Sequence, residues 1–168
     1  MNCVRHLAFA VACLAVHGIG AAAVTVNYVH DAQFTDLPRT PSQRQQALED
    51  ISAHFQALGK ALPAGQDLVI DVLDIDLAGR EDPNRVALSG VRVQNPGGDW
   101  PRMRLRYSLV ADGKVLKSGD AQLSDKSHGN RVTAYPSDAR WPYEKQMIDD
   151  WWRATIVPDQ TAAQVATE

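Results

Sequence analysis

The chain contains little cysteine. Of its 168 residues only Cys3 and Cys13 are cysteines, and both lie near the N-terminus. If an N-terminal leader that contains them is removed, the remaining chain has no disulfide, no thiolate nucleophile and no thiolate metal ligand. Its fold must then depend on a hydrophobic core, which a chain of this length is able to form.

Long apolar runs are equally scarce. The unbroken run over residues 7–16 is half of the about 20 residues that a membrane-spanning helix needs. It follows Arg5 and precedes the small residues of GIGAAA at 18–23, which is the order of a secretory signal peptide. We predict a signal peptide over residues 1–23, cleaved after Ala23, and a periplasmic chain with no transmembrane segment after cleavage. The alternative, a lipoprotein acylated at Cys13, lacks the usual leucine just before the cysteine.

Neither sign of charge dominates the sequence. There are 17 Lys and Arg against 20 Asp and Glu, a formal net charge of −3 and a mean hydropathy of −0.28. Loss of residues 1–23 removes Arg5, their one charged side chain, and changes the net charge to −4. These values argue against a polytopic membrane protein and against a nucleic-acid binder. The sequence also lacks a P-loop, a dinucleotide fingerprint and an H-E-x-x-H motif, so we predict no cofactor.

The periodicity of the apolar residues predicts strands and helices in a mixed order. We expect a strand over 24–29, a helix from Pro41 that ends before Pro63, a strand over 68–77, a weak strand over 86–93, a hairpin over 102–123 and a helix from Pro142 that ends before Pro158. Two amphipathic helices need one sheet face to cover. The predicted fold class is therefore α+β: a two-layer sandwich with a mostly antiparallel sheet, covered on one face by both helices. One domain is expected over residues 24–157, followed by a disordered tail over 158–168.

Two local features refine the strands. In strand 68–77 the apolar residues change from even to odd positions, which indicates a β-bulge near Leu73. The hairpin has two possible turns. A three-residue loop with a left-handed Gly113 pairs Leu105 with Gly119, whereas a two-residue Asp112–Gly113 loop would place Leu105 opposite Asp120. We favour the three-residue loop because it keeps apolar side chains together on one face.

The sequence resembles a bacterial envelope family, domain of unknown function 3016. The resemblance rests on VTVNYVHDAQFTD at 24–36, DIDLAG at 74–79, RLRYSLVADGKVLKSGDAQLSD at 104–125 and PYEKQMIDDWW at 142–152. These segments follow one another over nearly the whole chain after the leader. The resemblance implies an exported protein of a Gram-negative bacterium, and it implies no activity and no catalytic residues.

A stripe of arginines is the first candidate site. Arg102, Arg104 and Arg106 alternate along one predicted strand, so their side chains share a face. Guanidinium groups bind phosphate and carboxylate groups through paired donors, which would suit an anionic envelope glycan or lipid headgroup. The simpler interpretation is the polar face of a half-buried sheet, with Arg104 opposite Asp120.

An acidic run is the second candidate. Asp74 and Asp76 are two residues apart on a predicted strand, so their carboxylates would lie about 7 Å apart on one face, with Asp71 nearby. Such oxygen ligands suit a hard cation such as calcium. However, the run lacks the calcium-loop pattern. The simpler interpretation is that these side chains cap the turn at 77–79 or pair with arginines.

The histidines offer little for catalysis. Asp125, Ser127 and His128 are close enough in sequence to suggest a hydrolytic triad, but such near neighbours rarely reach triad geometry and no G-x-S-x-G motif is present. His54 lies beside the apolar stripe of the first helix and is interpreted as a residue at the edge of that stripe.

Tryptophans form the last candidate group. Trp151 and Trp152 are adjacent in the final helix, so they point about 100° apart and cannot both face the core centre. One is expected in the core. The other, with Trp100 and Trp141, could offer an aromatic surface, and Trp152 is kept as a candidate ligand-binding residue.

Together these features predict a small exported protein that binds another envelope protein or an anionic envelope component and has no catalytic activity. The alternative is a metal-dependent or hydrolytic envelope enzyme that uses the region of Asp71, Asp74 and Asp76.

Overall fold

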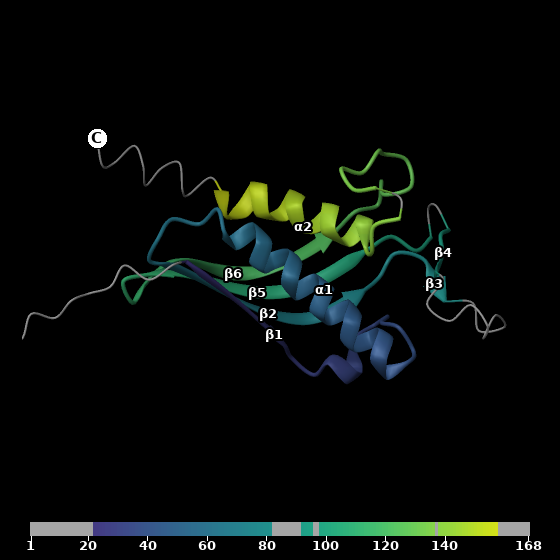
Figure 1. The fold of residues 1–168 in the computed structure, drawn as a ribbon, viewed down its shortest axis with the longest axis horizontal. Coiled ribbons are helices and arrows are strands. Elements are labelled where there is room, and N and C mark those ends of the chain that lie inside the picture. Colours follow the sequence, from purple (N-terminus) through teal and green to yellow (C-terminus); the bar gives the residue numbers. More distant parts are fainter. Residues whose placement is uncertain (1–21, 82–91, 96–97, 137, 158–168) are drawn as a thin grey trace, which may run out of the picture.

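A four-stranded mixed sheet forms the centre of the molecule (Figure 1). The computed structural model describes residues 22–81, 92–95, 98–136 and 138–157. The sheet has the order β1-β2-β5-β6, with β1 over Ala23–Tyr28, β2 over Gln66–Asp76, β5 over Arg102–Ala111 and β6 over Lys114–Ser124. β1 runs parallel to β2, and the other neighbours are antiparallel. The short strands β3 (Arg80–Glu81) and β4 (Arg92–Val93) pair in a separate small sheet.

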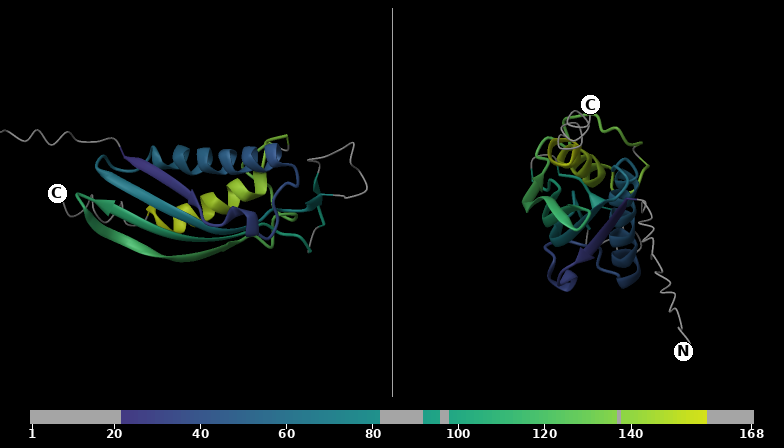
Figure 2. Two further views of the ribbon diagram at one scale, coloured as in Figure 1. Left: turned by 90° about the horizontal axis from the view of Figure 1, so that it is seen from below. Right: turned by 90° about the vertical axis from the view of Figure 1, so that its left-hand side faces the viewer.

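Two helices cover one face of this sheet (Figure 2). The helix α1 spans Pro41–Gly59 and contacts β1, whereas α2 spans Pro142–Thr155 and contacts β6; the two helices also contact each other. A short 3-10 helix, η1 (Asp31–Gln33), follows β1. The predicted two-layer α+β sandwich with a mostly antiparallel sheet is confirmed. The core lies between the layers, and its most buried members are Ile51, Phe55, Leu68, Ile70, Val72, Ile75, Leu105, Leu109, Ile148 and Ile156.

The opposite face of the sheet carries polar side chains. Burial alternates along β1, β2 and β5, so every second residue points away from the helices. We call this surface the open face; its residues include Thr25, Asn27, Asp71, Asp74, Arg104, Arg106, Asp120 and Gln122. Within the described ranges, neither helix packs on it.

The predicted bulge in β2 is present. The pairing of β2 with β5 shifts between Val72 and Asp74, because Leu73 is an extra residue. Val72 and Ile75 consequently both face the helices although they are three residues apart. A regular strand would have turned one of them outward. The bulge therefore explains why the apolar phase changes within this strand.

The predicted hairpin loop is wrong, although the predicted faces are right. The turn has two residues, Asp112 and Gly113, both with left-handed φ values of 49° and 74°, as a type I′ turn requires. A second bulge then inserts Leu116, because Val110 pairs with Val115 whereas Leu109 pairs with Lys117. From there on, every partner on β6 lies two residues beyond the predicted one.

The shifted register changes two predicted pairs. Leu105 lies opposite Ala121 instead of Gly119, and Asp120 lies opposite Arg106 instead of Arg104. A shift of two residues preserves which side chains face the core, because the side-chain period of a strand is two.

Several predictions concern residues outside the described ranges. These are residues 1–21 of the signal peptide predicted over 1–23, most of the weak strand predicted over 86–93, of which only Arg92 and Val93 are described, and the tail over 158–168. Residue 23, the last of the predicted leader, is the first residue of β1. In the described part of the chain, no helix has the length and hydrophobicity to cross a membrane.

Candidate functional site

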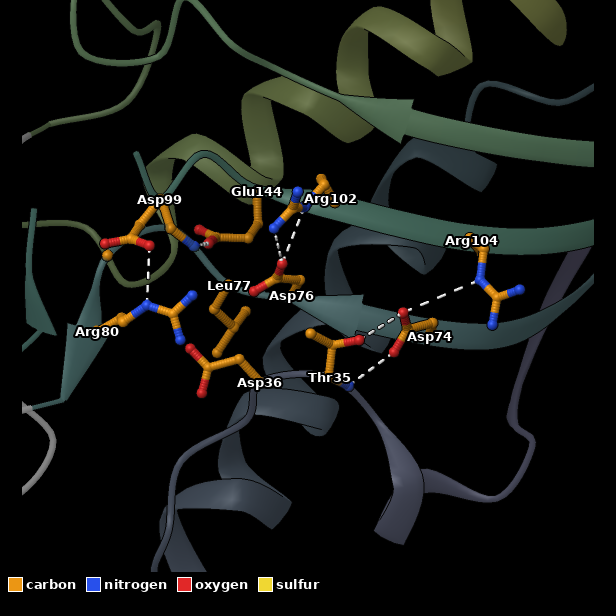
Figure 3. A network of polar contacts seen from close by, with 12 residues as sticks. Thr35, Asp36, Asp74, Asp76, Leu77, Arg80, Asp99, Arg102, Arg104 and Glu144 are labelled. Atoms are coloured by element: carbon orange, nitrogen blue, oxygen red, sulfur yellow. Dashed lines mark hydrogen bonds and ion pairs between the residues drawn. The ribbon is translucent and has the colours of Figure 1, made fainter. Parts of the chain in front are cut away.

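The acidic run and the arginine stripe lie opposite each other in the sheet. Asp71, Asp74 and Asp76 on β2 pair with Arg106, Arg104 and Arg102 on β5, in that order. Figure 3 shows part of this ladder. The bulge at Leu73 produces the alignment, because without it Asp71 and Asp74 would point to opposite faces. The two candidate sites of the sequence are therefore the two sides of one ladder of charges.

Each carboxylate of the ladder has its own partners. Asp71 accepts a hydrogen bond from the Asn27 side chain at 2.8 Å. Asp74 accepts two from Thr35, from the backbone N–H and from the hydroxyl, both at 2.8 Å (Figure 3). Asp76 accepts from Nε of Arg102 at 2.9 Å and also from its Nη2.

These contacts occupy several of the carboxylate oxygens of the acidic run. Within the described ranges, no three His, Cys, Asp or Glu side chains are grouped so that they could hold a metal ion. The oxygens of Asp74 and Asp76 instead accept hydrogen bonds from the hydroxyl, backbone and guanidinium donors described above. Asp71, Asp74 and Asp76 thus accept hydrogen bonds from Asn27, Thr35 and Arg102, and a metal ion at these carboxylates stays a prediction.

The arginines of the stripe differ in exposure and pairing. Arg106 forms an ion pair with Asp120 at 3.1 Å, where the two side chains are 62% and 71% exposed. Arg104 lies 3.9 Å from Asp74. Arg102 also lies over the Trp100 ring, 4.9 Å from its centroid, beside Lys126 at 5.4 Å. A groove of about 480 Å³ is lined by Asp74, Trp100, Arg102, Arg104 and Lys126 but not by Arg106.

A larger hollow lies at the end of the sheet where α2 begins. This end pocket has a volume of about 860 Å³. Its wall combines three arginines with three aromatic side chains and one buried acid: Arg92, Arg131, Arg140, Tyr135, Trp141, Tyr143 and Glu144. Among these residues, only Trp141 is a candidate from the sequence alone.

Arg92 is the most buried of these arginines. Its side chain is 7% exposed and forms an ion pair with Asp36. Nε donates to the carbonyl of Ala78 at 2.9 Å, and Nη2 donates to the carbonyl of Gly79 at 2.5 Å. The other terminal nitrogen, Nη1, is buried and has no hydrogen-bond partner in the described part of the chain. Arg92 therefore has unused donors at the pocket wall.

The other two arginines of the pocket, Arg131 and Arg140, form ion pairs with aspartates at its rim. Arg131 connects two elements, with Nη2 at 2.8 Å from Asp125 and 2.6 Å from Asp150 of α2. These contacts raise the pKa of Arg131, mainly through the hydrogen bond to Asp150. Arg140 pairs with Asp50 of α1 at 3.0 Å.

Glu144 forms the inner wall of the pocket. It is 2% exposed, and its Oε1 accepts a hydrogen bond from the backbone N–H of Ala78 at 2.7 Å (Figure 3). Burial raises the pKa of Glu144, against the opposing effects of the Ala78 N–H and the charge of Arg92. The peptide groups of Ala78 are thus held on both sides, by Glu144 at its nitrogen and by Arg92 at its oxygen.

The histidines have structural contacts. His128 is 2% exposed, its ring contacts that of Tyr143 at 5.0 Å, and neither ring nitrogen has a hydrogen-bond partner among the described residues. It is therefore not joined to Ser127 and Asp125 as a triad would require. His54 is more than the edge residue we expected, because its Nε2 lies 2.8 Å from Oδ1 of Asp149 and joins the two helices.

The tryptophans separate as the helix geometry predicts. Trp152 is 3% exposed and belongs to the core. Trp151 is partly buried and packs edge-on against Phe55 and Tyr107. Trp141 reaches the end pocket, and its Nε1 donates to Asp50 at 3.1 Å. Trp100, Trp141 and Trp151 line hollows at the surface, whereas Trp152, the candidate ligand-binding residue, is buried in the core.

Together these features define a class of protein: a two-layer α+β domain with a charge-paired open face and an arginine-rich end pocket. The chain belongs to the DUF3016 family, described as proteins of unknown function, whose family model matches residues 22–154. No curated protein matches the sequence significantly.

The solved structures that this chain matches are distant in both sequence and structure. One is a PelC dodecamer from Paraburkholderia phytofirmans, 13% identical, with a TM-score of 0.34 over 80% of this chain and 84% of that one. Another is a DUF330 family protein from Xanthomonas campestris, 15% identical, with a TM-score of 0.39 over 86% of this chain and 87% of that one.

Proposed function

We propose that the chain is an exported, periplasmic binding protein without catalytic activity, and that its end pocket holds an anionic envelope component. Export is supported by the order of residues 1–23, in which a positive residue, an apolar run of ten residues and small residues follow one another. An anionic ligand is supported by the donors around the pocket. The ligand carries a carboxylate or a phosphate group, the two groups that a guanidinium binds in pairs.

One observation carries this proposal: Nη1 of Arg92 is buried at the pocket wall without a hydrogen-bond partner among the described residues. A buried donor that stays unpaired costs about 1–3 kcal/mol, and more when the group is charged. An anion in the pocket would remove that cost. Arg131 adds a second such donor, because its Nε is also buried and unpaired in the described residues.

The start of α2 supports the same ligand. Trp141, Pro142 and Tyr143 line the pocket, so the N-terminus of this 14-residue helix faces it. Helix N-termini carry a partial positive charge and backbone N–H groups without partners inside the helix. The rings of Trp141 and Tyr143 offer flat apolar surfaces beside these donors, as sugar rings require.

The arginines of the open face suit this role less well. Arg104 and Arg106 are 57% and 62% exposed, so water and salt screen them, and each lies near a carboxylate. In the pocket Arg92 is 7% and Arg131 34% exposed, and a charge-assisted hydrogen bond is stronger where water is excluded.

The binding test compares two arginines in similar ion pairs. The chain from residue 22 onward, which contains every described element, is titrated by calorimetry with inorganic phosphate and with glucuronate, and with glucosamine as a cationic control. We expect both anions to bind and Arg140→Gln, in the pocket, to weaken binding about fivefold or more. Arg106→Gln, on the open face, should leave the dissociation constant unchanged. Loss of binding in the Arg106 variant only, or no binding of either anion, would contradict the proposal.

Export is tested separately. The full chain is expressed in a Gram-negative host, the cells are fractionated, and the mass of the recovered protein is measured. We expect a periplasmic protein that begins at Val24. A cytoplasmic protein of full mass would disprove export, and a lipid-modified N-terminus at Cys13 would show the lipoprotein alternative.

A further inference from the structure

The end of the sheet opposite the end pocket has a different surface. Ala23, Asp67, Val110 and Val115 lie in one row across the four strands. The β5–β6 turn follows immediately, at the left of Figure 1. We call this surface, made of the start of β1, residues 111–117 around the turn and the end of α2, the hairpin end. With about 3.3 Å per residue, the 11 residues of β2 separate it from the end pocket by about 35 Å.

Exposed apolar side chains gather at the hairpin end. Val115 and Leu116 are 58% and 49% exposed, and Val157, just beyond α2, is 37% exposed. These are three of the six large apolar side chains found exposed in the described residues. Lys117 donates to the carbonyl of Thr155 at 2.8 Å, which holds the hairpin against the end of α2.

The second bulge explains this exposure. In a regular hairpin, neighbouring residues of β6 would alternate between the two faces. Leu116 is the extra residue of the bulge, so Val115 and Leu116 are both exposed at the tip of the strand. The turn itself, Asp112–Gly113, is tight, so the pair lies within three residues of the tip of the hairpin.

Basic side chains outnumber acidic ones around Val115 and Leu116. Lys60, Lys114 and Lys117 lie in the connections and strand ends at this end, against Asp67 and Asp112. The backbone N–H of Ala23 donates to Oδ1 of Asp67 at 3.1 Å, which partly occupies that acid. Lysines next to exposed apolar side chains favour an anionic lipid surface, to which each basic residue adds attraction.

The point where the chain enters the fold identifies the occupant. Residue 22 joins β1 at the hairpin end, and the apolar run at 7–16 precedes it by only a few residues. A chain delivered through a membrane by that run therefore begins with its hairpin end next to the bilayer. We propose that the hairpin end docks on the surface of an anionic lipid bilayer, with Val115 and Leu116 entering the headgroup region. The end pocket then faces away from the membrane.

The docking is expected to be weak and reversible because the contact area with the bilayer is small. Two partly exposed apolar side chains and a few lysines bury far less than an inserted amphipathic helix does. Removal of the two apolar side chains should therefore weaken binding to anionic vesicles about tenfold. High salt should weaken it as well, because it screens the lysines.

The test uses flotation of the chain from residue 22 with vesicles made of equal parts phosphatidylglycerol and phosphatidylcholine. Vesicles of phosphatidylcholine alone are the lipid control. The variant is Val115→Ser with Leu116→Ser. The matched control is Val132→Ser, because Val132 is 97% exposed but lies at the end pocket. Thermal unfolding checks that each variant is folded.

We expect wild type and the Val132 variant to float with the anionic vesicles and the double variant to stay behind. The proposal is overturned if wild type does not float, or if the double variant floats equally well. Light scattering adds a further outcome: a dimer that the double variant abolishes would show that a second copy covers this end. Arg140→Gln should float normally, so a failure of anion binding in the pocket is distinguishable from a failure of docking.

Discussion

The open face and the end pocket are built from the same two residue types, arginine and aspartate, in different surroundings. On the open face Arg106 and Asp120 are both more than half exposed, so water and salt screen their attraction. In the pocket Arg92 is 7% exposed and is bound to backbone carbonyls as well as to Asp36. An ion pair on the open face is expected to contribute little to the free energy of unfolding. The buried pair of Arg92 and Asp36 instead fixes the position of the segments that form the pocket wall.

The largest effect is expected from the buried acid of the pocket. Glu144→Ala should lower the free energy of unfolding by about 3 kcal/mol, because it leaves the Ala78 N–H unpaired and opens a cavity beside it. Glu144→Gln keeps an oxygen acceptor and nearly the same volume, so it should stay within about 1 kcal/mol of wild type. Urea denaturation measures both. Equal losses in the two variants would show that the charge, and not the hydrogen bond, holds this wall.

The same residue should make the stability of the fold depend on pH. Because burial raises the pKa of Glu144 in the folded chain, the folded state binds this proton more tightly than the unfolded state. Stability is then greatest below the ordinary glutamate pKa and falls as pH rises through the raised one. Glu144→Gln removes this fall. The free energy of unfolding of wild type and of this variant is measured in urea at several pH values from mildly acidic to neutral. The two values should converge at low pH. A constant difference between them at all pH values would show that Glu144 does not cause the pH dependence.

A smaller effect is expected when two acids of the sheet, Asp76 on β2 and Asp120 on β6, are compared. The side chain of Asp76 is 8% exposed, and it accepts from Nε of Arg102 at 2.9 Å, so Asp76→Ala should cost about 1–2 kcal/mol. Asp120 is 71% exposed, so Asp120→Ala should change stability by less than about 0.5 kcal/mol. If both variants lost the same free energy of unfolding, burial would not explain the difference between these two aspartates. Thermal and urea unfolding of both variants provide the comparison.

The smallest effect is expected from metal ions. Calcium or zinc at millimolar concentration should leave the melting temperature unchanged, because Asp74 and Asp76 already accept hydrogen bonds from Thr35 and Arg102. A rise in melting temperature that Asp74→Asn abolishes would instead support a metal site in the acidic run.

Much of the fold was predictable, because periodicity records which side chains face the core. The two helices, the bulge near Leu73 and the faces of the hairpin all followed from apolar spacing. The register of the hairpin did not. The register depends on a bulge at Leu116. Because the adjacent apolar residues Val115 and Leu116 are both exposed and neither packs in the core, the apolar pattern gives no sign of this bulge.

The end pocket was harder to predict, because it joins segments far apart in the chain. Arg92 reaches Asp36 and Ala78 across 56 and 14 positions, and no local pattern encodes such contacts. Glu144 did leave a signal. It stands three and four residues before the buried Met147 and Ile148, so it shares their helix face, where an acid is unusual.

The bulge at Leu73 has a consequence for how related sequences can be aligned. Val72 pairs with Leu105 and Asp74 with Arg104, so the ladder has no place for Leu73. A relative that lacks this one residue would keep every other pair and every face. Loss of one residue anywhere else in β2 would turn part of the strand inside out. A one-residue gap at this position is therefore the single length change that the strand can absorb, and an alignment that places the gap elsewhere would wrongly exchange core and surface.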